Sequence, residues 1–125
     1  MNLKKLTEAE ARVILHKGTE APFTGEFYKK PNQEGKYLCK QCGAELFSTA
    51  DQFNSHCGWP SFDDETPSSV KKVTDADGRR TEILCQKCDG HLGHIFHGEG
   101  FTKKDARYCV NSISLDFVKL KSSEK

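Results

Sequence analysis

The sequence predicts a mainly β domain, built from antiparallel strands and preceded by one N-terminal helix. Apolar side chains recur at helical spacing within residues 7–17, whereas Gly and Pro interrupt the chain at short intervals from Pro22 onward. Short runs rich in β-branched and aromatic residues lie between these interruptions. The chain has 125 residues, the size of one domain, so we expect a single unit over 1–125 with flexible ends at 1–6 and 119–125.

The helix is expected over residues 7–17. Thr7 and Glu10 have the spacing of a capping box, in which each side chain accepts a hydrogen bond from the backbone amide of the other residue. Gly18 is expected to end the helix. The face expected to be buried comprises Ala11, Ile14 and Leu15.

Five strand-like segments follow the helix. Residues 75–78, which separate the third segment from the fourth, have the composition of a tight turn and predict a hairpin. The last segment has the clearest alternation of apolar side chains, and we expect one continuous strand there. The five segments are residues 35–39, 45–47, 69–74, 79–84 and 107–118.

Charge and hydropathy exclude two classes of partner. Nineteen Lys and Arg against eighteen Asp and Glu leave a net charge of +1, whereas nucleic-acid-binding domains are strongly basic. The longest aliphatic run, residues 13–15, is far shorter than a membrane-spanning helix, and the first residues have no secretory pattern. We therefore expect a cytoplasmic protein that binds neither nucleic acid nor membrane. In that reducing compartment, patterned cysteines favour metal or redox chemistry over structural disulfides.

Four of the six cysteines form two CxxC pairs. Two intervening residues let both thiolates of a pair reach one ion across a tight turn, and small neighbouring residues let backbone amides approach the sulfurs. The pattern favours one structural Zn²⁺, although four thiolates also suit iron and the pairs could be redox-active thiols. A site closed by four thiolates would stabilise the fold without taking part in a reaction. The four residues are Cys39, Cys42, Cys85 and Cys88.

The two remaining cysteines, Cys57 and Cys109, lie among residues suited to chemistry. In the predicted strand Cys109 alternates with Arg107 and Asn111, so the three side chains would share a face. A neighbouring guanidinium lowers the pKa of a thiol and so favours the nucleophilic thiolate, whereas a buried and inert Cys109 is the alternative. Cys57 lies in a loop with Trp59, the single tryptophan. A lone tryptophan is more often a core anchor, but in a Gly-Trp-Pro turn it is less easily buried, and its indole face then suits a methyl or sulfur group.

Three of the five histidines fall within residues 91–97, directly after the second CxxC pair. With four thiolates already available for a metal, these histidines are not needed as ligands. As a group beside a rigid knuckle, they favour an acid–base role.

Taken together, these motifs resemble the methionine-R-sulfoxide reductases, the B type of peptide methionine sulfoxide reductase. The matching pieces occur in the family's order and extend from about residue 7 to residue 118. They are residues 18–25 (GTEAPFTG), the two CxxC pairs, residues 57–62 (CGWPSF), residues 91–94 (HLGH) and residues 107–112 (RYCVNS).

The resemblance implies two antiparallel sheets, with the four-cysteine zinc site distant from the active site. It implies that Cys109 is the nucleophile that attacks the sulfoxide sulfur, and that His91 and His94 bind or protonate the sulfoxide oxygen. Cys109 would become a sulfenic acid, and Cys57 would resolve it by forming a disulfide. Thioredoxin would then reduce the disulfide.

The same resemblance implies the substrate pocket. Arg107 and Asn111 would complete it, Trp59 would pack against the S-methyl group, and Phe62 would also contact the substrate. The substrate would be methionine-R-sulfoxide, free or in proteins, and we expect a monomer.

The sequence departs from the family's pattern in the turn after His94. No role is therefore carried over to His97, and the role of Glu99 stays open. A non-catalytic zinc-binding interaction module on the same scaffold is the alternative hypothesis. Such a module would have no need of Cys109, His91, His94 and Trp59 together.

Overall fold

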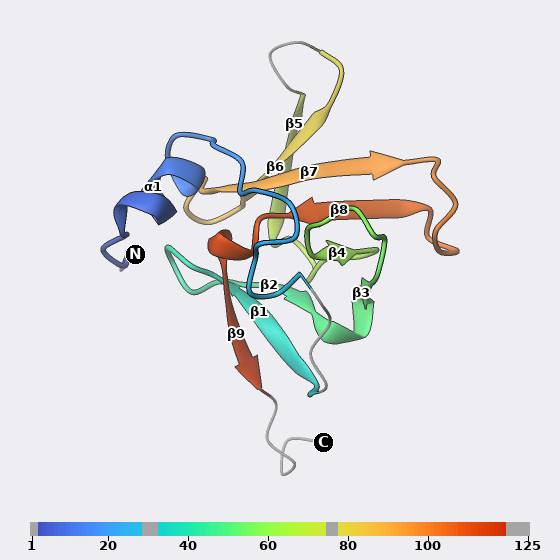
Figure 1. Cartoon of the computed structure of the whole chain (residues 1–125), viewed down its shortest axis with the longest axis horizontal. Helices are drawn as coiled ribbons and strands as arrows, with labels where there is room; N and C mark the ends of the chain where they lie inside the picture. The colour runs from blue at the N-terminus through green and yellow to red at the C-terminus, as the bar shows by residue number, and fades with distance from the viewer. Residues whose placement is uncertain (1–2, 29–32, 75–77, 120–125) are drawn as a thin grey trace.

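A computed structural model of the chain describes residues 3–28, 33–74 and 78–119 (Figure 1). Within these residues the fold is mainly β, with two antiparallel sheets and one N-terminal α-helix, which confirms the predicted fold class. The elements are α1 (Glu8–Ile14), β1 (Gly35–Cys39), β2 (Glu45–Ser48), the 3₁₀ turn η1 (Thr49–Asp51), β3 (Gln52–Phe53), β4 (Ser61–Phe62), β5 (Val70–Thr74), β6 (Thr81–Cys85), β7 (His91–His97), β8 (Ala106–Val110), the 3₁₀ turn η2 (Ser112–Ser114) and β9 (Leu115–Lys119).

The strands divide between a sheet of three and a sheet of six. The smaller sheet has the order β2-β1-β9, and the larger has the order β3-β4-β8-β7-β6-β5. Figure 1 shows β7 and β8 lying side by side across the molecule, with β1 and β9 below them and the β5–β6 hairpin projecting above. Short β4 pairs with β8 and thereby joins the loop that precedes it to the centre of the larger sheet.

The helix begins as predicted but ends earlier. The capping box of Thr7 and Glu10 is present in both directions. The last helical residue is Ile14, and Lys17 then takes a left-handed conformation with φ of 59°, so the chain turns before Gly18. As a result Leu15 is 53% exposed, and its predicted burial is wrong. No helix in the described parts of the chain is long and apolar enough to cross a membrane.

The long strand predicted over residues 107–118 is wrong, because the chain breaks it in two. β8 ends at Val110 in the larger sheet, the η2 turn follows Asn111, and β9 continues in the smaller sheet. Within β8, Tyr108 and Val110 are buried in the core, whereas Cys109 lies on the opposite, less buried face. The segment that carries Cys109 therefore passes directly from one sheet to the other.

Aromatic side chains fill the space between the two sheets. Phe47 of β2 stacks on Phe62 of β4 with ring centroids 4.4 Å apart, and Tyr37 and Tyr108 pack edge-on against this pair. Complete burial of a Phe side chain contributes roughly 2–3 kcal/mol. The aromatic core therefore holds β4 against the smaller sheet. It thereby also fixes the position of the loop that precedes β4.

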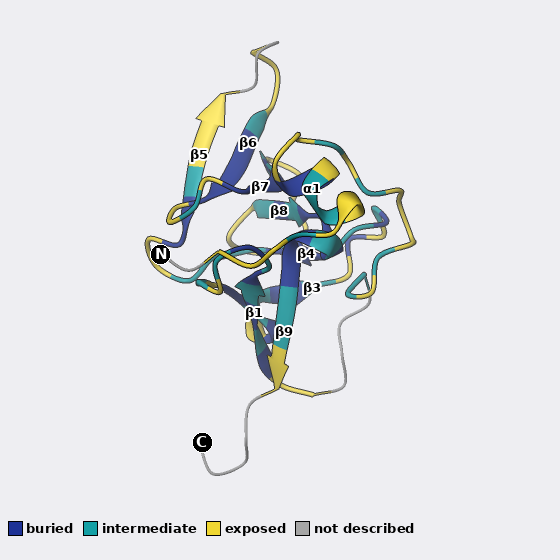
Figure 2. Ribbon diagram, turned by 90° about the vertical axis from the view of Figure 1, so that its left-hand side faces the viewer, coloured by how far each residue is buried: buried dark blue, intermediate teal, exposed yellow. Residues whose placement is uncertain are grey.

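The predicted hairpin is present as β5 and β6, which pair antiparallel and end with Thr74 opposite Thr81. Its turn residues 75–77 lie outside the described residues. Figure 2 shows that β6 and β7 are largely buried, whereas the distal half of β5 is exposed. Strand β7 was not predicted from the sequence. Its pattern of His and Gly has little of the β-branched character that marks a strand.

The two ends predicted to be flexible lie only partly within the described residues. Lys4 donates a backbone hydrogen bond to the carbonyl of Gln41 and forms an ion pair with Asp116. Lys119 is the last residue of β9. Residues 1–2 and 120–125 lie outside the described part of the chain.

Candidate active site and cysteine cluster

A cavity of about 160 Å³ opens between strands β7 and β8, the loop before β4 and the loop after α1. It is lined by both cysteines outside the CxxC pairs, and its lining residues come from five separate segments of the chain. The lining residues are Thr19, Cys57, Trp59, Arg80, Gly93, His94, Phe96, Arg107, Cys109, Val110 and Asn111.

The two cavity cysteines come together because β4 pairs with β8. Ser61 of β4 lies opposite Cys109, so the loop before β4 ends beside the nucleophile candidate. This loop turns through left-handed conformations at His56 and Gly58, with φ of 62° and 98°. The turn brings the Cys57 sulfur to 3.9 Å from the Cys109 sulfur. Two cysteines that are 52 residues apart in the sequence thus lie close together in space. A small movement of their side chains would bring the sulfurs to disulfide distance.

The two sulfurs titrate as a pair. The Cys57 sulfur also lies 3.4 Å from the hydroxyl of Ser61. A hydrogen bond from Cys109, aided by the hydroxyls of Ser55 and Ser61, lowers the pKa of Cys57 to about 4. The same hydrogen bond, together with burial, raises the pKa of Cys109. Arg107 acts on the Cys109 pKa in the predicted downward direction but is outweighed. The pair therefore holds one negative charge and one shared proton, with the charge favoured on Cys57.

A β-bulge in β7 brings two histidines to neighbouring positions. Ile83 and Leu84 of β6 are consecutive, yet they pair with Gly93 and His91, so one extra residue is inserted in β7. In a regular strand residues three apart point to opposite faces, and a bulge re-aims them. The ring centroids of His91 and His94 are accordingly 5.8 Å apart.

Gly93, between the two histidines, permits the close approach of β7 to the backbone of β8 at Cys109. A Cβ atom built at this position would lie 1.9 Å from the carbonyl oxygen of Cys109 and 3.1 Å from the Cα atom of Val110. Those neighbours are backbone atoms of β8, which cannot move aside cheaply. Only glycine therefore fits at this point of the cavity wall.

The two histidines differ in their environments. His94 lines the cavity, whereas His91 is buried behind it and is not among the lining residues. The Nδ1 atom of His91 lies 2.8 Å from a carboxylate oxygen of Glu82, which is itself buried and forms a 3.0 Å ion pair with Lys17. Burial lowers the pKa of His91, and the carboxylate opposes this. The carboxylate of Glu82 accepts a hydrogen bond from Nδ1–H, and Nε2 is therefore the nitrogen without a proton in the neutral ring.

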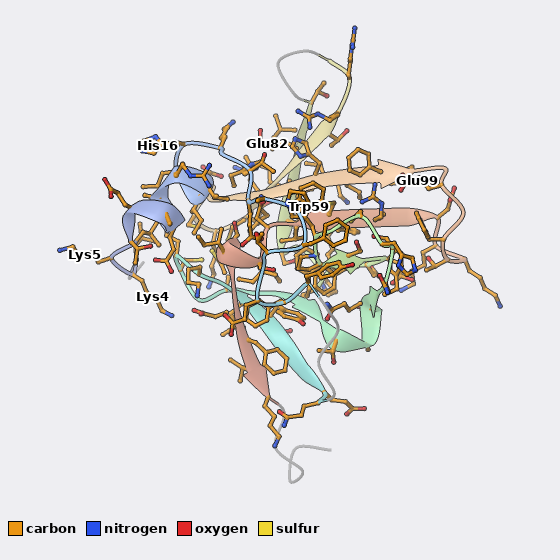
Figure 3. All side chains as sticks on the ribbon, viewed as in Figure 1. Lys4, Lys5, His16, Trp59, Glu82 and Glu99 are labelled. Carbon is orange, nitrogen blue, oxygen red and sulfur yellow. The ribbon has the colours of Figure 1, made fainter. Side chains whose placement is uncertain are left out.

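Arg107 is fixed by an acidic partner that the sequence left without a role. Its Nε and Nη2 atoms donate to the two carboxylate oxygens of Glu99 at 2.7 and 3.2 Å. Its guanidinium also lies over the ring of Phe96, 4.6 Å from the centroid. Figure 3 shows Glu99 beyond the end of β7. This bidentate pairing holds the guanidinium beside the cysteine pair, where it favours negative charge on sulfur.

Trp59 and Asn111 are held by the loop after α1. The indole Nε1 atom donates to the carbonyl of Glu20 at 2.8 Å, and the Oδ1 atom of Asn111 accepts from the amide of Glu20 at 2.9 Å. The other end of the Asn111 amide donates to the carbonyl of Leu92 at 3.1 Å. Figure 3 shows Trp59 at the centre of the molecule beside this loop. Both side chains thus have set orientations at the cavity wall.

Phe62 lies apart from the other predicted site residues. It is completely buried, stacks on Phe47 and is not among the residues that line the cavity. The substrate contact expected for it is corrected on this ground, since alternation along β4 directs its side chain to the core. The supporting residues that the sequence reading missed are Lys17, Thr19, Glu20, Arg80, Glu82, Gly93 and Phe96. Residues 17–20 adjoin or lie within the GTEAPFTG motif, and this was the signal that could have pointed to them.

The four CxxC cysteines gather where β1 and β6 end. The sulfurs of Cys39 and Cys88 are 3.5 Å apart, as are those of Cys42 and Cys85, and all four lie within 4.8 Å of one another. Four thiolates at 2.3 Å from a tetrahedral zinc are about 3.8 Å apart, so the cluster has the dimensions of a single metal site. None of the four lines the cavity.

Backbone amides support the sulfurs of the cluster. The amide of Cys42 donates to the sulfur of Cys39, and the amides of Lys87 and Cys88 donate to the sulfur of Cys85. Such donors stabilise thiolate charge around a metal. The donor set and its spacing therefore fit one metal ion.

Comparison with known proteins places the chain among named relatives. Residues 6–119 match the SelR domain. The chain is 49% identical over 121 residues to peptide methionine sulfoxide reductase B3, chloroplastic, of Oryza sativa subsp. japonica, covering 96% of this chain and 52% of that protein. It is 50% identical over 114 residues to peptide methionine sulfoxide reductase B2, chloroplastic, of Arabidopsis thaliana, covering 90% and 56%. The chain thus spans about half the length of these two relatives.

A shorter relative is matched over most of its length. The chain is 48% identical over 120 residues to peptide methionine sulfoxide reductase B8 of Arabidopsis thaliana, covering 95% of this chain and 83% of that protein. The crystal structure of the Mis18 'Yippee-like' domain has a similar fold, with a TM-score of 0.54 over 72% of this chain and all of that one, at 18% identity. On the extent of these matches, the chain belongs to the SelR domain family, together with the B-type peptide methionine sulfoxide reductases.

Proposed function

We propose that this protein reduces methionine-R-sulfoxide, free or in proteins, to methionine. The observation that carries the proposal is the pair of sulfurs of Cys57 and Cys109, 3.9 Å apart at the wall of one cavity. The same cavity offers a histidine and a guanidinium beside those sulfurs. The membership of the SelR domain family and the names of the relatives support the same reaction.

The substrate enters the cavity with its sulfoxide facing Cys109. The indole of Trp59 packs against the S-methyl group, which is apolar and suits an aromatic face. Asn111 closes the opposite part of the cavity as a wall, since both ends of its amide are already hydrogen-bonded to the backbone. Phe62 acts from the core by holding β4 in place.

The first step forms a sulfenic acid and releases methionine. The Cys109 sulfur attacks the sulfoxide sulfur while its proton passes to the neighbouring Cys57 sulfur, and Arg107 favours the negative charge that develops. His94, which lines the cavity, donates a proton to the sulfoxide oxygen, because an unprotonated oxide is a very poor leaving group. The attack forms a bond between the two sulfurs, and the protonated oxygen then moves to the Cys109 sulfur as this bond and the S–O bond of the substrate break. Methionine is released with its sulfur reduced by two electrons, and Cys109 is left as a sulfenic acid with its sulfur oxidised by the same two electrons.

His91 acts from behind His94. Its Nδ1 atom is committed to Glu82, whose other oxygen is held by Lys17. This chain of contacts fixes the tautomer and the ring plane of His91, which packs edge-on against His94. His91 therefore orients the proton donor and sets its surroundings.

The second step restores a reducible enzyme. The Cys57 sulfur attacks the sulfenic sulfur of Cys109, a disulfide forms, and the hydroxyl leaves as water with the proton that Cys57 had accepted. Thioredoxin, an external dithiol, then reduces the disulfide by thiol exchange. Per cycle, one sulfoxide and one external dithiol give methionine, water and one external disulfide.

Cys39, Cys42, Cys85 and Cys88 hold one Zn²⁺ with a structural role. Their sulfurs are the right distance apart for one tetrahedral ion, and four thiolates leave no open position for substrate. The ion would supply no chemistry to the reaction, and it stabilises the ends of β1 and β6. Metal binding in such sites is coupled to folding, so the ion would contribute a large part of the free energy of folding.

The protein acts as a monomer in the cytoplasm. All the residues assigned to the cavity come from one chain, so the site is complete without a second copy. A reducing compartment keeps the cavity thiols available, although two relatives carry chloroplastic names.

The test uses the separate R and S epimers of a methionine sulfoxide substrate. With a dithiol reductant, wild-type protein is expected to form methionine from the R epimer only, and Cys109→Ser is expected to form none. The amount of methionine is measured by chromatography. Formation of methionine by the Cys109→Ser variant, or equal turnover of both epimers, would contradict the assignment.

A further inference from the structure

We propose that Glu20 is a positioning residue, which sets the orientation of Trp59 and Asn111 at the cavity wall. The expected effect on kinetics rests on the proposed function. The coupling of the Glu20 side chain to the Trp59 indole is a structural claim and does not depend on that function. Glu20 itself is not among the residues that line the cavity.

Two cavity side chains from distant segments meet on the peptide groups of this one residue. The Trp59 indole donates to the Glu20 carbonyl at 2.8 Å across a sequence separation of 39 residues. The Glu20 amide donates to the Asn111 side chain at 2.9 Å across 91 residues. The two peptide groups that flank the Glu20 Cα atom therefore orient the Trp59 and Asn111 side chains. Any rotation of the backbone at Glu20 would disturb both hydrogen bonds.

The Glu20 carboxylate is what fixes that backbone. Its Oε1 atom accepts a hydrogen bond from the Ser112 amide at 2.9 Å, and it also accepts from the amide of Ile113. These amides begin the η2 turn, directly after Asn111. The half-buried carboxylate thus anchors the loop after α1 to the segment that carries Asn111. An exposed loop would otherwise have only weak restraint on its peptide planes.

The loop packs closely around this anchor at Gly25. A Cβ atom at Gly25 would lie 2.2 Å from the Ser112 hydroxyl oxygen and 2.7 Å from Glu20 Oε1. The Ser112 hydroxyl in turn accepts from the amide of Phe27 at 3.2 Å. The loop therefore lies directly against η2, next to the Glu20 carboxylate.

Loss of the carboxylate is expected to alter substrate binding more than thiol chemistry. Trp59 and Asn111 shape the cavity, whereas the hydrogen bonds of the Cys57 and Cys109 sulfurs are made with Trp59, Ser61 and each other. A substitution should therefore raise KM while leaving the rate of the chemical step nearly unchanged. A residue that merely stabilised the fold would lower the melting temperature without separating KM from kcat.

The experiment uses Trp59 as its own probe, because it is the only tryptophan. In Glu20→Ala, the single indole N–H resonance of the ¹⁵N-labelled, substrate-free protein should shift, and its exchange with water should quicken at least about tenfold. The KM for a methionine-R-sulfoxide peptide should rise about tenfold, with kcat changed less than about threefold. Glu26→Ala, an exposed carboxylate in the same loop, is the matched control and should change none of these quantities.

Glu20→Gln decides the matter if Glu20→Ala does not fold. It keeps one oxygen acceptor for the Ser112 amide, and its indole signal and KM should lie between wild type and the alanine variant. An unchanged indole resonance and an unchanged KM in a folded Glu20 variant would overturn the inference. If wild-type protein failed to reduce any sulfoxide, the proposed function would fail, whereas the indole measurement would still test the coupling.

Discussion

The six cysteines form two groups that the fold treats in opposite ways. In the CxxC cluster, pairs of sulfurs lie 3.5 Å apart, backbone amides point at them, and none of the four cysteines lines the cavity between β7 and β8. In the cavity pair, two sulfurs lie 3.9 Å apart and face an opening with a histidine and a guanidinium beside it. The same functional group is thus offered for ligation in one place and for reaction in the other.

The difference teaches that sulfur count and access decide the role of a cysteine. Four convergent sulfurs give one ion a complete coordination shell, which excludes substrate. Two sulfurs leave the charge of one thiolate uncompensated by a metal, so it stays available as a nucleophile or base. Substitutions in the cavity pair should therefore reduce activity, whereas substitutions in the CxxC cluster should reduce stability.

Cys109→Ser should give the largest effect of all. A hydroxyl is a far poorer nucleophile than a thiolate, so turnover of a methionine-R-sulfoxide substrate should fall at least about ten-thousandfold. The melting temperature should stay within a few degrees of wild type, because the substitution removes one sulfur at a cavity wall. Activity is measured as methionine formed, and stability by circular dichroism. If Cys109→Ser instead unfolded the protein, Cys109 would have a structural role, like the CxxC cysteines.

Cys39→Ser should give the converse result, with the fold lost and the chemistry intact in whatever protein remains folded. Removing one of four ligands weakens metal binding, and binding in such sites contributes folding free energy directly. We expect about one zinc per wild-type chain by elemental analysis, and a loss of metal with a lowering of the melting temperature by more than about 10 °C in the variant. A metal-free variant as stable as wild type would contradict the structural role.

Cys57→Ser should show an effect of intermediate size that depends on how activity is measured. The first turnover does not need the disulfide, so about one equivalent of methionine per chain should still form in a single-turnover experiment, at a lower rate because the sulfur that accepts the Cys109 proton is missing. Steady-state turnover with thioredoxin should fall about a hundredfold, since no intramolecular disulfide is available for exchange. Unchanged recycling would mean that another thiol resolves the sulfenic acid.

The smallest expected effect concerns pH. Because the pKa of Cys57 is lowered to about 4, mainly by Cys109, its thiolate is present above that pH and is lost only as the pH falls through about 4. Alkylation of Cys57 by iodoacetamide, located by mass spectrometry, should therefore be nearly independent of pH between about 5 and 8. The rate itself should be modest, because nucleophilicity falls together with pKa.

Cys109→Ala is the matched test of that pH dependence. It removes the hydrogen bond that lowers the Cys57 pKa most, so alkylation should regain a slope toward tenfold per pH unit across part of the same range. A flat profile in this variant would mean that Ser55 and Ser61 alone keep Cys57 ionised. The CxxC cysteines serve as internal references in the same digest.

The sequence predicted the elements whose signals are local. The capping box of Thr7 and Glu10 and the short strand over residues 35–39 depend on neighbouring residues, and both are present as expected. The paired CxxC motifs likewise carry their chemistry in a four-residue spacing, and their sulfurs do converge. Local spacing was therefore sufficient for the fold class and for the cysteine cluster.

Other features depend on contacts between distant segments, and the sequence could not provide these. The break after Val110 arises because β9 pairs with β1, so regular alternation over residues 107–118 misled the strand prediction. The proximity of His91 and His94 depends on a bulge set by pairing with β6. The buried carboxylate of Glu82 gains its role only when β6, β7 and the segment after α1 meet.

The order of the cysteines along the chain has a consequence for the catalytic cycle. Residue 57 lies between the two CxxC motifs and residue 109 lies beyond both, so a metal that links residues 42 and 85 and a disulfide that links residues 57 and 109 close interleaved loops. In the proposed cycle, each oxidation would add a second long-range link to a chain already closed by the metal, and each reduction would remove it. The polypeptide would thus alternate between one and two kinds of long-range cross-link, and its unfolded ensemble would have less entropy during the oxidised half of every cycle.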